Sequence, residues 1–204
     1  TNTVEATVAD DFRVRTIDVA GTTISIFEVS DPTSDDGCDA DSPRSAMCGG
    51  VLWPGSRAAA EALAEMSLAG RTVVEIGAGT GLCSLAAASM GAAEVVATDA
   101  SPGVLELIEA AAAAQDLGVV RTQVFDFLGD AAASPVRGVD IAVAADLLYT
   151  EEITRAVART CAALKTGGAA VIVTDSQRRH RDTFLDELDR CLPRADREFE
   201  ATTV

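Results

Sequence analysis

The spacing of apolar residues changes along the chain and divides the sequence into three stretches. Residues 12–29 alternate apolar and polar positions on both sides of Ala20-Gly21, which predicts a β-hairpin. Residues 30–50 are rich in Asp, Ser, Gly and Pro, and this composition predicts a flexible surface loop. Across residues 53–204, short apolar runs alternate with longer stretches of helical pattern.

This alternation predicts a parallel β-sheet with helices on both faces. We therefore expect an α/β fold, with a Rossmann-like, doubly wound, mostly parallel sheet and the N-terminal hairpin, as a single domain over residues 1–204. Residues 53–204 would form its core, and residues 198–204 are a candidate for one further strand. The expected strands are 72–76, 94–98, 122–125, 139–145 and 169–174, and the expected helices are 54–66, 81–90, 102–116, 152–165 and 178–191.

Composition and charge narrow the range of partners. Apolar residues make up 48% of the chain but aromatic residues only 4%, so the core must consist mainly of aliphatic side chains. The net charge of -16 argues against a nucleic-acid partner, because phosphate backbones attract Lys and Arg. Five cysteines without a C-x-x-C pair argue against a zinc site or a disulfide framework. No apolar run reaches membrane-spanning length, and the acidic start resembles neither a signal peptide nor a transit peptide. We expect a cytoplasmic monomer that binds no metal, nucleic acid or membrane.

The sequence after the first expected sheet strand indicates a ligand site. Gly77, Gly79 and Gly81 follow strand 72–76 and lead into a helix, where glycines allow a sharp turn and a close approach of the backbone to a ligand. The start of that helix would direct unpaired N–H groups toward an anionic group. Asp99 ends the next strand, at the usual position of a carboxylate that accepts hydrogen bonds from ribose hydroxyls. The pattern predicts a ligand that carries a nucleoside.

The charges around this turn favour S-adenosylmethionine as the ligand that carries the nucleoside. Leu82 stands where the dinucleotide fingerprint has its third Gly or Ala. Residues 72–120 contain no Lys or Arg, whereas Glu75 and Asp99 both lie there. Such a field favours the positively charged sulfonium of S-adenosylmethionine over a pyrophosphate. NAD remains an alternative, since many sites bind it through backbone groups alone.

At this point the motifs resemble a known family. The stretches VVEIGAGTGL and VVATD resemble the glycine motif and ribose-binding acid of seven-strand S-adenosylmethionine methyltransferases. The stretches LWPGSRAAAEAL and ADLLYTEE resemble the protein-lysine methyltransferases of methyltransferase family 16, and the likeness extends over about residues 12–192. The family sheet ends with two further strands, and only residues 198–204 fit that part, so the chain is either a fragment or has a shorter sheet edge.

The resemblance implies roles for individual residues in cofactor binding. The backbone of Gly77, Ala78 and Gly79 would hold the methionine end of the cofactor, and Asp99 would bind the ribose. Glu75 would either orient the glycine turn or bind the methionine amine. Four further positions complete the implied cofactor site: Trp53 as a wall of the pocket, Ala145 near the reacting methyl, and Asp126 with Phe127 beside the adenine, where Phe127 replaces the usual Trp.

Asp146 and Tyr149 are the candidate catalytic residues. Asp146 follows strand 139–145, and ligands of open α/β sheets bind outside the carboxyl ends of the strands. If the chain turns into a helix there, Tyr149 lies one turn away on the same face. The carboxylate would position a lysine ε-amine, and the ring would face its cationic form. Alternatively, Asp146 only caps the following helix and Tyr149 only packs.

We therefore expect an S-adenosylmethionine-dependent methyltransferase that acts on a lysine of a protein substrate and releases S-adenosylhomocysteine. Three alternatives stay open at this stage. The chain could methylate a small molecule or another side-chain nitrogen, it could be a nucleotide-binding dehydrogenase, or it could be a binding module without activity.

Overall fold

The computed structural model describes residues 12–29, 49–129, 136–176 and 179–192, and the predicted loop lies almost entirely outside these ranges. Strands β1 (Phe12–Val19) and β2 (Thr22–Val29) pair antiparallel, with Val19 opposite Thr22. Ala20 and Gly21 form the turn with φ of 49° and 83°, as the two-residue hairpin turn requires. The predicted N-terminal hairpin is confirmed.

Five strands form the parallel sheet that the sequence predicts. They are β3 (Thr72–Ile76), β4 (Glu94–Asp99), β5 (Val120–Val124), β6 (Ile141–Ala145) and β7 (Ala170–Thr174). Their order is β5-β4-β3-β6-β7, and every neighbouring pair is parallel. The third strand starts two residues earlier than expected, because Val120 already pairs with Val95. The candidate strand 198–204 lies outside the described residues.

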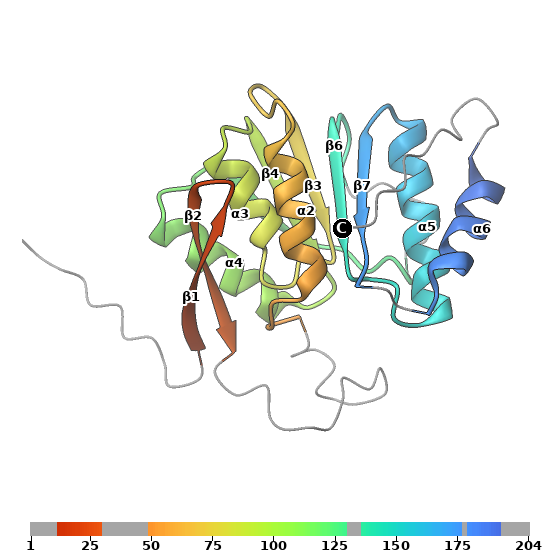
Figure 1. Cartoon of the computed structure of the whole chain (residues 1–204), viewed down its shortest axis with the longest axis horizontal. Helices are drawn as coiled ribbons and strands as arrows, with labels where there is room; N and C mark the ends of the chain where they lie inside the picture. The colour runs from red at the N-terminus through yellow and green to blue at the C-terminus, as the bar shows by residue number, and fades with distance from the viewer. Residues whose placement is uncertain (1–11, 30–48, 130–135, 177–178, 193–204) are drawn as a thin grey trace, which may run out of the picture.

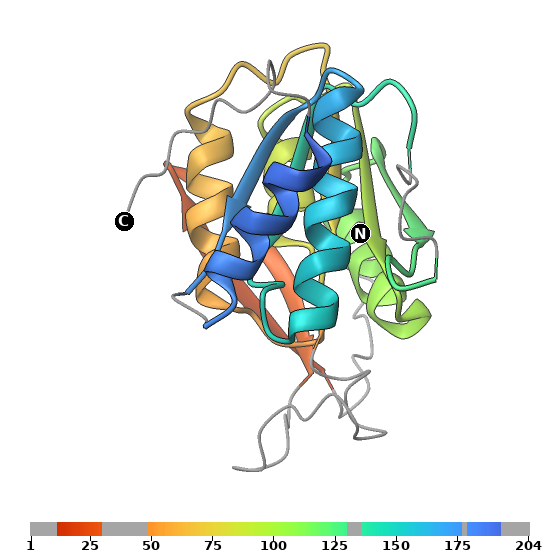
Figure 2. The same ribbon diagram turned by 90° about the vertical axis from the view of Figure 1, so that its right-hand side faces the viewer.

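The helices form a layer on each side of the sheet. Helices α2 (Pro54–Ala64), α3 (Leu82–Ser89) and α4 (Pro102–Ala114) lie on the side that the hairpin also covers (Figure 1). Helices α5 (Glu151–Thr166) and α6 (Arg181–Cys191) lie next to each other on the opposite side (Figure 2). The doubly wound α/β prediction is confirmed.

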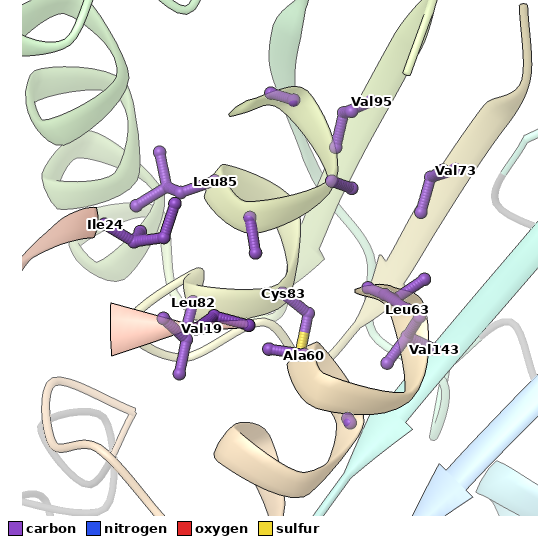
Figure 3. Packing of buried hydrophobic residues seen from close by; sticks show 14 of the residues in the cluster. Val19, Ile24, Ala60, Leu63, Val73, Leu82, Cys83, Leu85, Val95 and Val143 are labelled. Carbon is purple, nitrogen blue, oxygen red and sulfur yellow. The ribbon is translucent and has the colours of Figure 1, made fainter. Parts of the chain in front are cut away.

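Strand alternation divides the buried residues between the two sides. Val73 of β3 packs toward α2, α3 and the hairpin, among the side chains in Figure 3. Its neighbour Val74 points the other way, into the cluster formed with α5 and α6. Successive side chains of a strand point to opposite faces, so a strand that is buried on both sides is apolar at nearly every position. The core is aliphatic, as the composition predicts.

The strand order reverses between β3 and β6. From β3 the chain proceeds outward to β4 and β5, then returns to place β6 and β7 on the other side. At such a reversal the connections leave the sheet in opposite directions, and a crevice forms outside the carboxyl ends of the central strands. The glycine turn after β3, Asp99 at the end of β4 and Asp146 after β6 all lie at this edge.

The hairpin packs against α4, and the side chain of Gln115 at the end of α4 adds hydrogen bonds to β2. The Gln115 amide accepts a hydrogen bond from the Ser25 N–H and donates one to the Ser25 carbonyl, both at 2.8 Å. The same amide nitrogen donates to the Ala111 carbonyl. Gln115 therefore satisfies the backbone of β2 as a neighbouring strand would.

We expect Gln115→Ala to lower the free energy of unfolding by about 1–3 kcal/mol, because it leaves both polar groups of Ser25 without this partner. Urea denaturation measures the loss. The control is Glu61→Ala, which removes an exposed ion pair with Arg57 and should cost less than about 0.5 kcal/mol. Equal effects of the two substitutions would contradict the assigned role of Gln115.

Candidate functional site

The glycine turn has the backbone conformation that its sequence predicts. Gly77, Gly79 and Gly81 have φ of 60°, 54° and 71°, a region that side chains disfavour. A Cβ at Gly81 would also lie 2.8 Å from Ile108 Cγ1. The Ala78 N–H donates to the Thr98 carbonyl at 2.8 Å, so the turn is fixed to the end of β4.

Asp99 joins the next strand to this turn. Its Oδ2 accepts a hydrogen bond from the Gly79 N–H at 3.1 Å, and its Oδ1 accepts one from the Ser101 N–H at 2.9 Å. Burial raises the pKa of this carboxyl, although backbone hydrogen bonds from Ser101, Gly79 and Ala100 oppose the change. A carboxylate oxygen can accept two hydrogen bonds, so the group suits a pair of vicinal hydroxyls.

Glu75 lies beneath the helix that follows the turn. It is buried in β3, and its Oε2 accepts hydrogen bonds from the Ser84 N–H at 2.8 Å and the Ser84 hydroxyl at 2.6 Å. Burial raises the pKa of this carboxyl above its usual 4.5. The stability contributed by this shift is fully present below pH 4.5 and is lost as the pH rises through the raised pKa. The side chain of Glu75 thus fixes the first turn of α3, and its two predicted roles, orienting the glycine turn or binding the methionine amine, stay predictions.

Asp146 is buried and connects distant parts of the chain. Its Oδ2 accepts a hydrogen bond from the Gly55 N–H at 2.6 Å. Its Oδ1 accepts bonds from the Ser176 N–H, at 2.8 Å, and from the Ser176 hydroxyl. Asp146 has φ of 57°, an uncommon conformation for a residue with a side chain, and such conformations concentrate at functional sites. The carboxylate is thus rigidly placed between the start of α2 and the end of β7.

The residues after Asp146 differ from one expectation. Thr150 is the N-cap of α5, and its hydroxyl accepts a hydrogen bond from the Ile153 N–H at 3.2 Å. The alternative in which Asp146 caps this helix is therefore wrong, because a nearer hydroxyl takes that position. Residues 147–150 are not helical, so Tyr149 does not stand one helical turn from Asp146. Tyr149 lies at the surface, with 44% of its area exposed.

Residues 49–55, here called the crossing segment, contact both halves of the site. A Cβ at Gly79 would lie 3.0 Å from the Gly49 carbonyl oxygen, so these backbones are in close contact. Trp53 is half-buried at the N-cap position of α2. Gly55 donates to Asp146, and its carbonyl accepts a hydrogen bond from the Thr174 hydroxyl at 2.8 Å.

The contacts of Gly55, Thr174 and Ser176 with this site were not predicted from the sequence. The sequence carries no specific signal for Gly55, since Gly103 also follows the first proline of a helix and a Cβ added there would meet no neighbouring atom within 4 Å. Here a Cβ at Gly55 would lie 2.6 Å from Asp146 Oδ2 and 2.7 Å from Cγ.

The predicted adenine-side residues and Ala145 lie at the ends of β5 and β6. The Phe125 N–H donates to the Asp99 carbonyl at 3.0 Å, which holds the turn after β5 beside β4. Asp126 is exposed, and its Oδ1 accepts a hydrogen bond from the Leu128 N–H at 2.9 Å. Phe127 and Ala145 are buried in the core clusters on opposite sides of the sheet. Stacking of Phe127 on an adenine stays a prediction.

The described ranges offer neither a metal centre nor a membrane-spanning helix. No three His, Cys, Asp or Glu side chains there are grouped so that they could hold a metal ion. None of the helices in those ranges combines the length and apolarity needed to cross a bilayer. Cys83 and Cys161 are buried free thiols, and burial raises the pKa of Cys161 to about 12, so these two are not nucleophiles at neutral pH.

Comparisons with known proteins agree with this geometry. The profile of a family described as lysine methyltransferase matches residues 36–191. The protein N-lysine methyltransferase METTL21A of Danio rerio is 32% identical over 131 residues, which are 62% of this chain and 59% of that protein. The chain therefore spans little more than half of the length of this relative.

Solved structures of methyltransferases share the fold. SMU.776, described as a methyltransferase and solved with S-adenosylhomocysteine, aligns with a TM-score of 0.61 at 17% identity, over 91% of this chain and 48% of that one. The T. thermophilus 16S rRNA methyltransferase RsmC, solved with S-adenosylmethionine and guanosine, aligns with a TM-score of 0.59 at 18% identity, over 88% of this chain and 46% of that one. At these identities the likeness concerns the fold.

We expect Gly55→Ala to lower the free energy of unfolding by about 1–3 kcal/mol, because the new methyl group collides with the fixed Asp146 carboxylate. Gly103→Ala is the matched control, since Gly103 also follows the first proline of a helix but a Cβ added there would meet no neighbouring atom within 4 Å. Gly103→Ala should raise the stability by up to about 1 kcal/mol. Thermal and urea denaturation measure the stability of both variants. A Gly55→Ala protein that is more stable than the wild type would show that the added methyl group does not collide with Asp146.

Proposed function

Since this chain belongs to the lysine methyltransferase family, we propose that it transfers the methyl group of S-adenosylmethionine to the ε-amine of a lysine in a protein substrate. S-adenosylhomocysteine would be the second product. The match covers only 59% of the relative METTL21A. The activity of this chain is therefore a proposal, and it rests on the residues of its own site. The proposal is carried by the direct hydrogen bond between Asp99 and the Gly79 backbone, within a stretch, residues 72–120, that contains no Lys or Arg.

The cofactor half of the site supports S-adenosylmethionine. The backbone of Gly77, Ala78 and Gly79 would hold its methionine end, with the N-terminus of α3 facing the carboxylate. Asp99 would accept hydrogen bonds from the ribose hydroxyls. Trp53, Ala145, Asp126 and Phe127 would line the remaining walls. The acidic surroundings favour a ligand with a positive sulfonium.

The acceptor half of the site supports a lysine amine. We assign Asp146 to positioning, because its carboxylate is fixed by the Gly55 and Ser176 backbones and lies at the crevice edge of β6. A rigid carboxylate orients an incoming nitrogen without having to reorganise. Tyr149 would contribute its exposed ring to the lysine channel, where an aromatic face attracts a cationic group.

Methyl transfer requires the neutral amine, although free lysine has a pKa of about 10.4. Asp146 favours the ammonium form, so it is not assigned as the base. The amine would lose its proton to solvent, assisted by the positive charge of the nearby sulfonium. The remaining catalytic effect is alignment of nitrogen, methyl and sulfur, which can lower a barrier by about 7 kcal/mol or more.

The surroundings of the enzyme are part of the proposal. Buried free thiols at Cys83 and Cys161 fit a reducing compartment, so we place the activity in the cytoplasm. The net charge of -16 supports a protein substrate over a nucleic acid. We further propose that the chain acts as a monomer and that residues 1–204 form one domain.

Calorimetric titration tests the cofactor. We expect S-adenosylhomocysteine to bind and NAD not to bind. Asp99→Ala should raise the dissociation constant about 10- to 100-fold, because hydrogen bonds to a charged group are lost. Glu106→Gln, an exposed substitution on α4, should leave it unchanged. Binding of NAD alone would favour the dehydrogenase alternative.

Labelling of a cell extract tests the acceptor. With radioactive S-adenosylmethionine, the protein should label a protein band, and hydrolysis of that band should release methyl-lysine. Tyr149→Ala should slow labelling on the order of tenfold while S-adenosylhomocysteine still binds, because the amine is held less well. Leu185→Ala is the control, since Leu185 on α6 is similarly exposed at 42%. Label confined to small metabolites, or to other side chains, would contradict a lysine acceptor.

A further inference from the structure

The hairpin contains a buried acid that serves no function described above. Glu28 in β2 is 0% exposed. Its Oε2 accepts a hydrogen bond from Arg13 Nε at 3.1 Å, and its Oε1 accepts one from the Arg15 guanidinium at 3.4 Å. A buried carboxylate is costly unless it is paired and hydrogen-bonded, so its remaining contact is informative.

That contact reaches beyond the hairpin. Glu28 Oε1 also accepts a hydrogen bond from the Leu52 N–H at 2.9 Å. Next to it, the Val29 N–H donates to the Gly50 carbonyl at 3.0 Å. Arg13 lies opposite Glu28 in the hairpin, and an ion pair between the two strands does not by itself require burial. Glu28 is nevertheless fully buried, and it is bonded to the backbone of the crossing segment.

Trp53 therefore lies between two anchored N–H groups. The Leu52 N–H, one residue before it, is bound to Glu28, and the Gly55 N–H, two residues after it, is bound to Asp146. Both anchors are carboxylates from distant parts of the chain, Glu28 in β2 and Asp146 directly after β6, and each accepts a backbone hydrogen bond. The same segment touches Gly79 through Gly49.

We infer that Glu28 is a positioning residue for the cofactor site, which makes the N-terminal hairpin a functional part of that site. This inference rests on the proposed function, because it assigns Trp53 and the glycine turn to cofactor binding. Glu28 fixes the crossing segment at Leu52, directly before Trp53, and so holds Trp53 in position relative to the glycine turn. Loss of Glu28 frees the segment at Leu52, whereas Val29 still bonds Gly50 and Asp146 still holds Gly55.

The test combines cofactor binding with the fluorescence of Trp53, the only Trp in the chain. Glu28→Ala should raise the dissociation constant for S-adenosylhomocysteine about tenfold or more, because the Leu52 N–H loses its charged acceptor. In the same variant the emission of Trp53 should move to longer wavelength before ligand is added. Glu28→Gln retains an acceptor for the Leu52 N–H, and it should restore most of the affinity and the emission.

Gln115→Ala is the matched control, because it loosens the hairpin at Ser25 and leaves the crossing segment untouched. It should lower stability while the affinity and the emission of Trp53 stay those of the wild type. If the wild-type protein binds S-adenosylhomocysteine and Glu28→Ala changes neither the affinity nor the Trp53 emission, this inference is wrong and the proposed function stands. Equal losses of affinity in Glu28→Ala and Gln115→Ala would reduce Glu28 to a general stabilising role and also overturn it. Failure of the wild-type protein to bind would instead disprove the proposed function, and the inference with it.

Discussion

The carboxylate of Asp146 holds together three parts of the chain that meet only in the folded protein. It accepts from Gly55, 91 positions earlier, and from Ser176, 30 positions later. These bonds fix the start of α2 and the end of β7 around the carboxyl end of β6, where the strand order reverses. The positive φ of Asp146 is retained because the surrounding bonds fix this residue from both sides. The geometry of the crevice depends on this junction.

Hydrogen bonds from backbone N–H groups to acidic side chains also occur at other places in the structure. Glu28 accepts from the Leu52 N–H, Glu75 from the Ser84 N–H, and Asp99 from the N–H groups of Gly79 and Ser101. Each acid fixes a loop or the start of a helix by accepting a hydrogen bond from a backbone N–H of that segment. The contact therefore does not depend on the side chains of the segment. Of these acids, Glu75 and Asp99 lie within residues 72–120, which contain no Lys or Arg, and a negative field there suits a positively charged methyl donor.

Much of the fold could be predicted from the sequence, because its signals are local. The hairpin, the five strands and the order of helices follow from apolar periodicity and from the positions of Gly and Pro. The expected start of β5 is two residues late, because the pairing of Val120 and Arg121 with β4 extends the strand. The cap of α5 is not decided by residue type, because Asp146 is a good capping residue but the conformation places the Thr150 hydroxyl at the cap instead.

The sequence by itself determined the glycine turn, its acidic partner Asp99 and the absence of basic residues between them, because all lie within one strand–helix–strand unit. Only the tertiary structure decided that Asp146 binds Gly55 and Ser176 and that Glu28 binds Leu52. The physical reason is that the donors in these contacts are backbone N–H groups. Every residue except proline carries the same N–H, so no side-chain pattern marks which one a distant carboxylate will find.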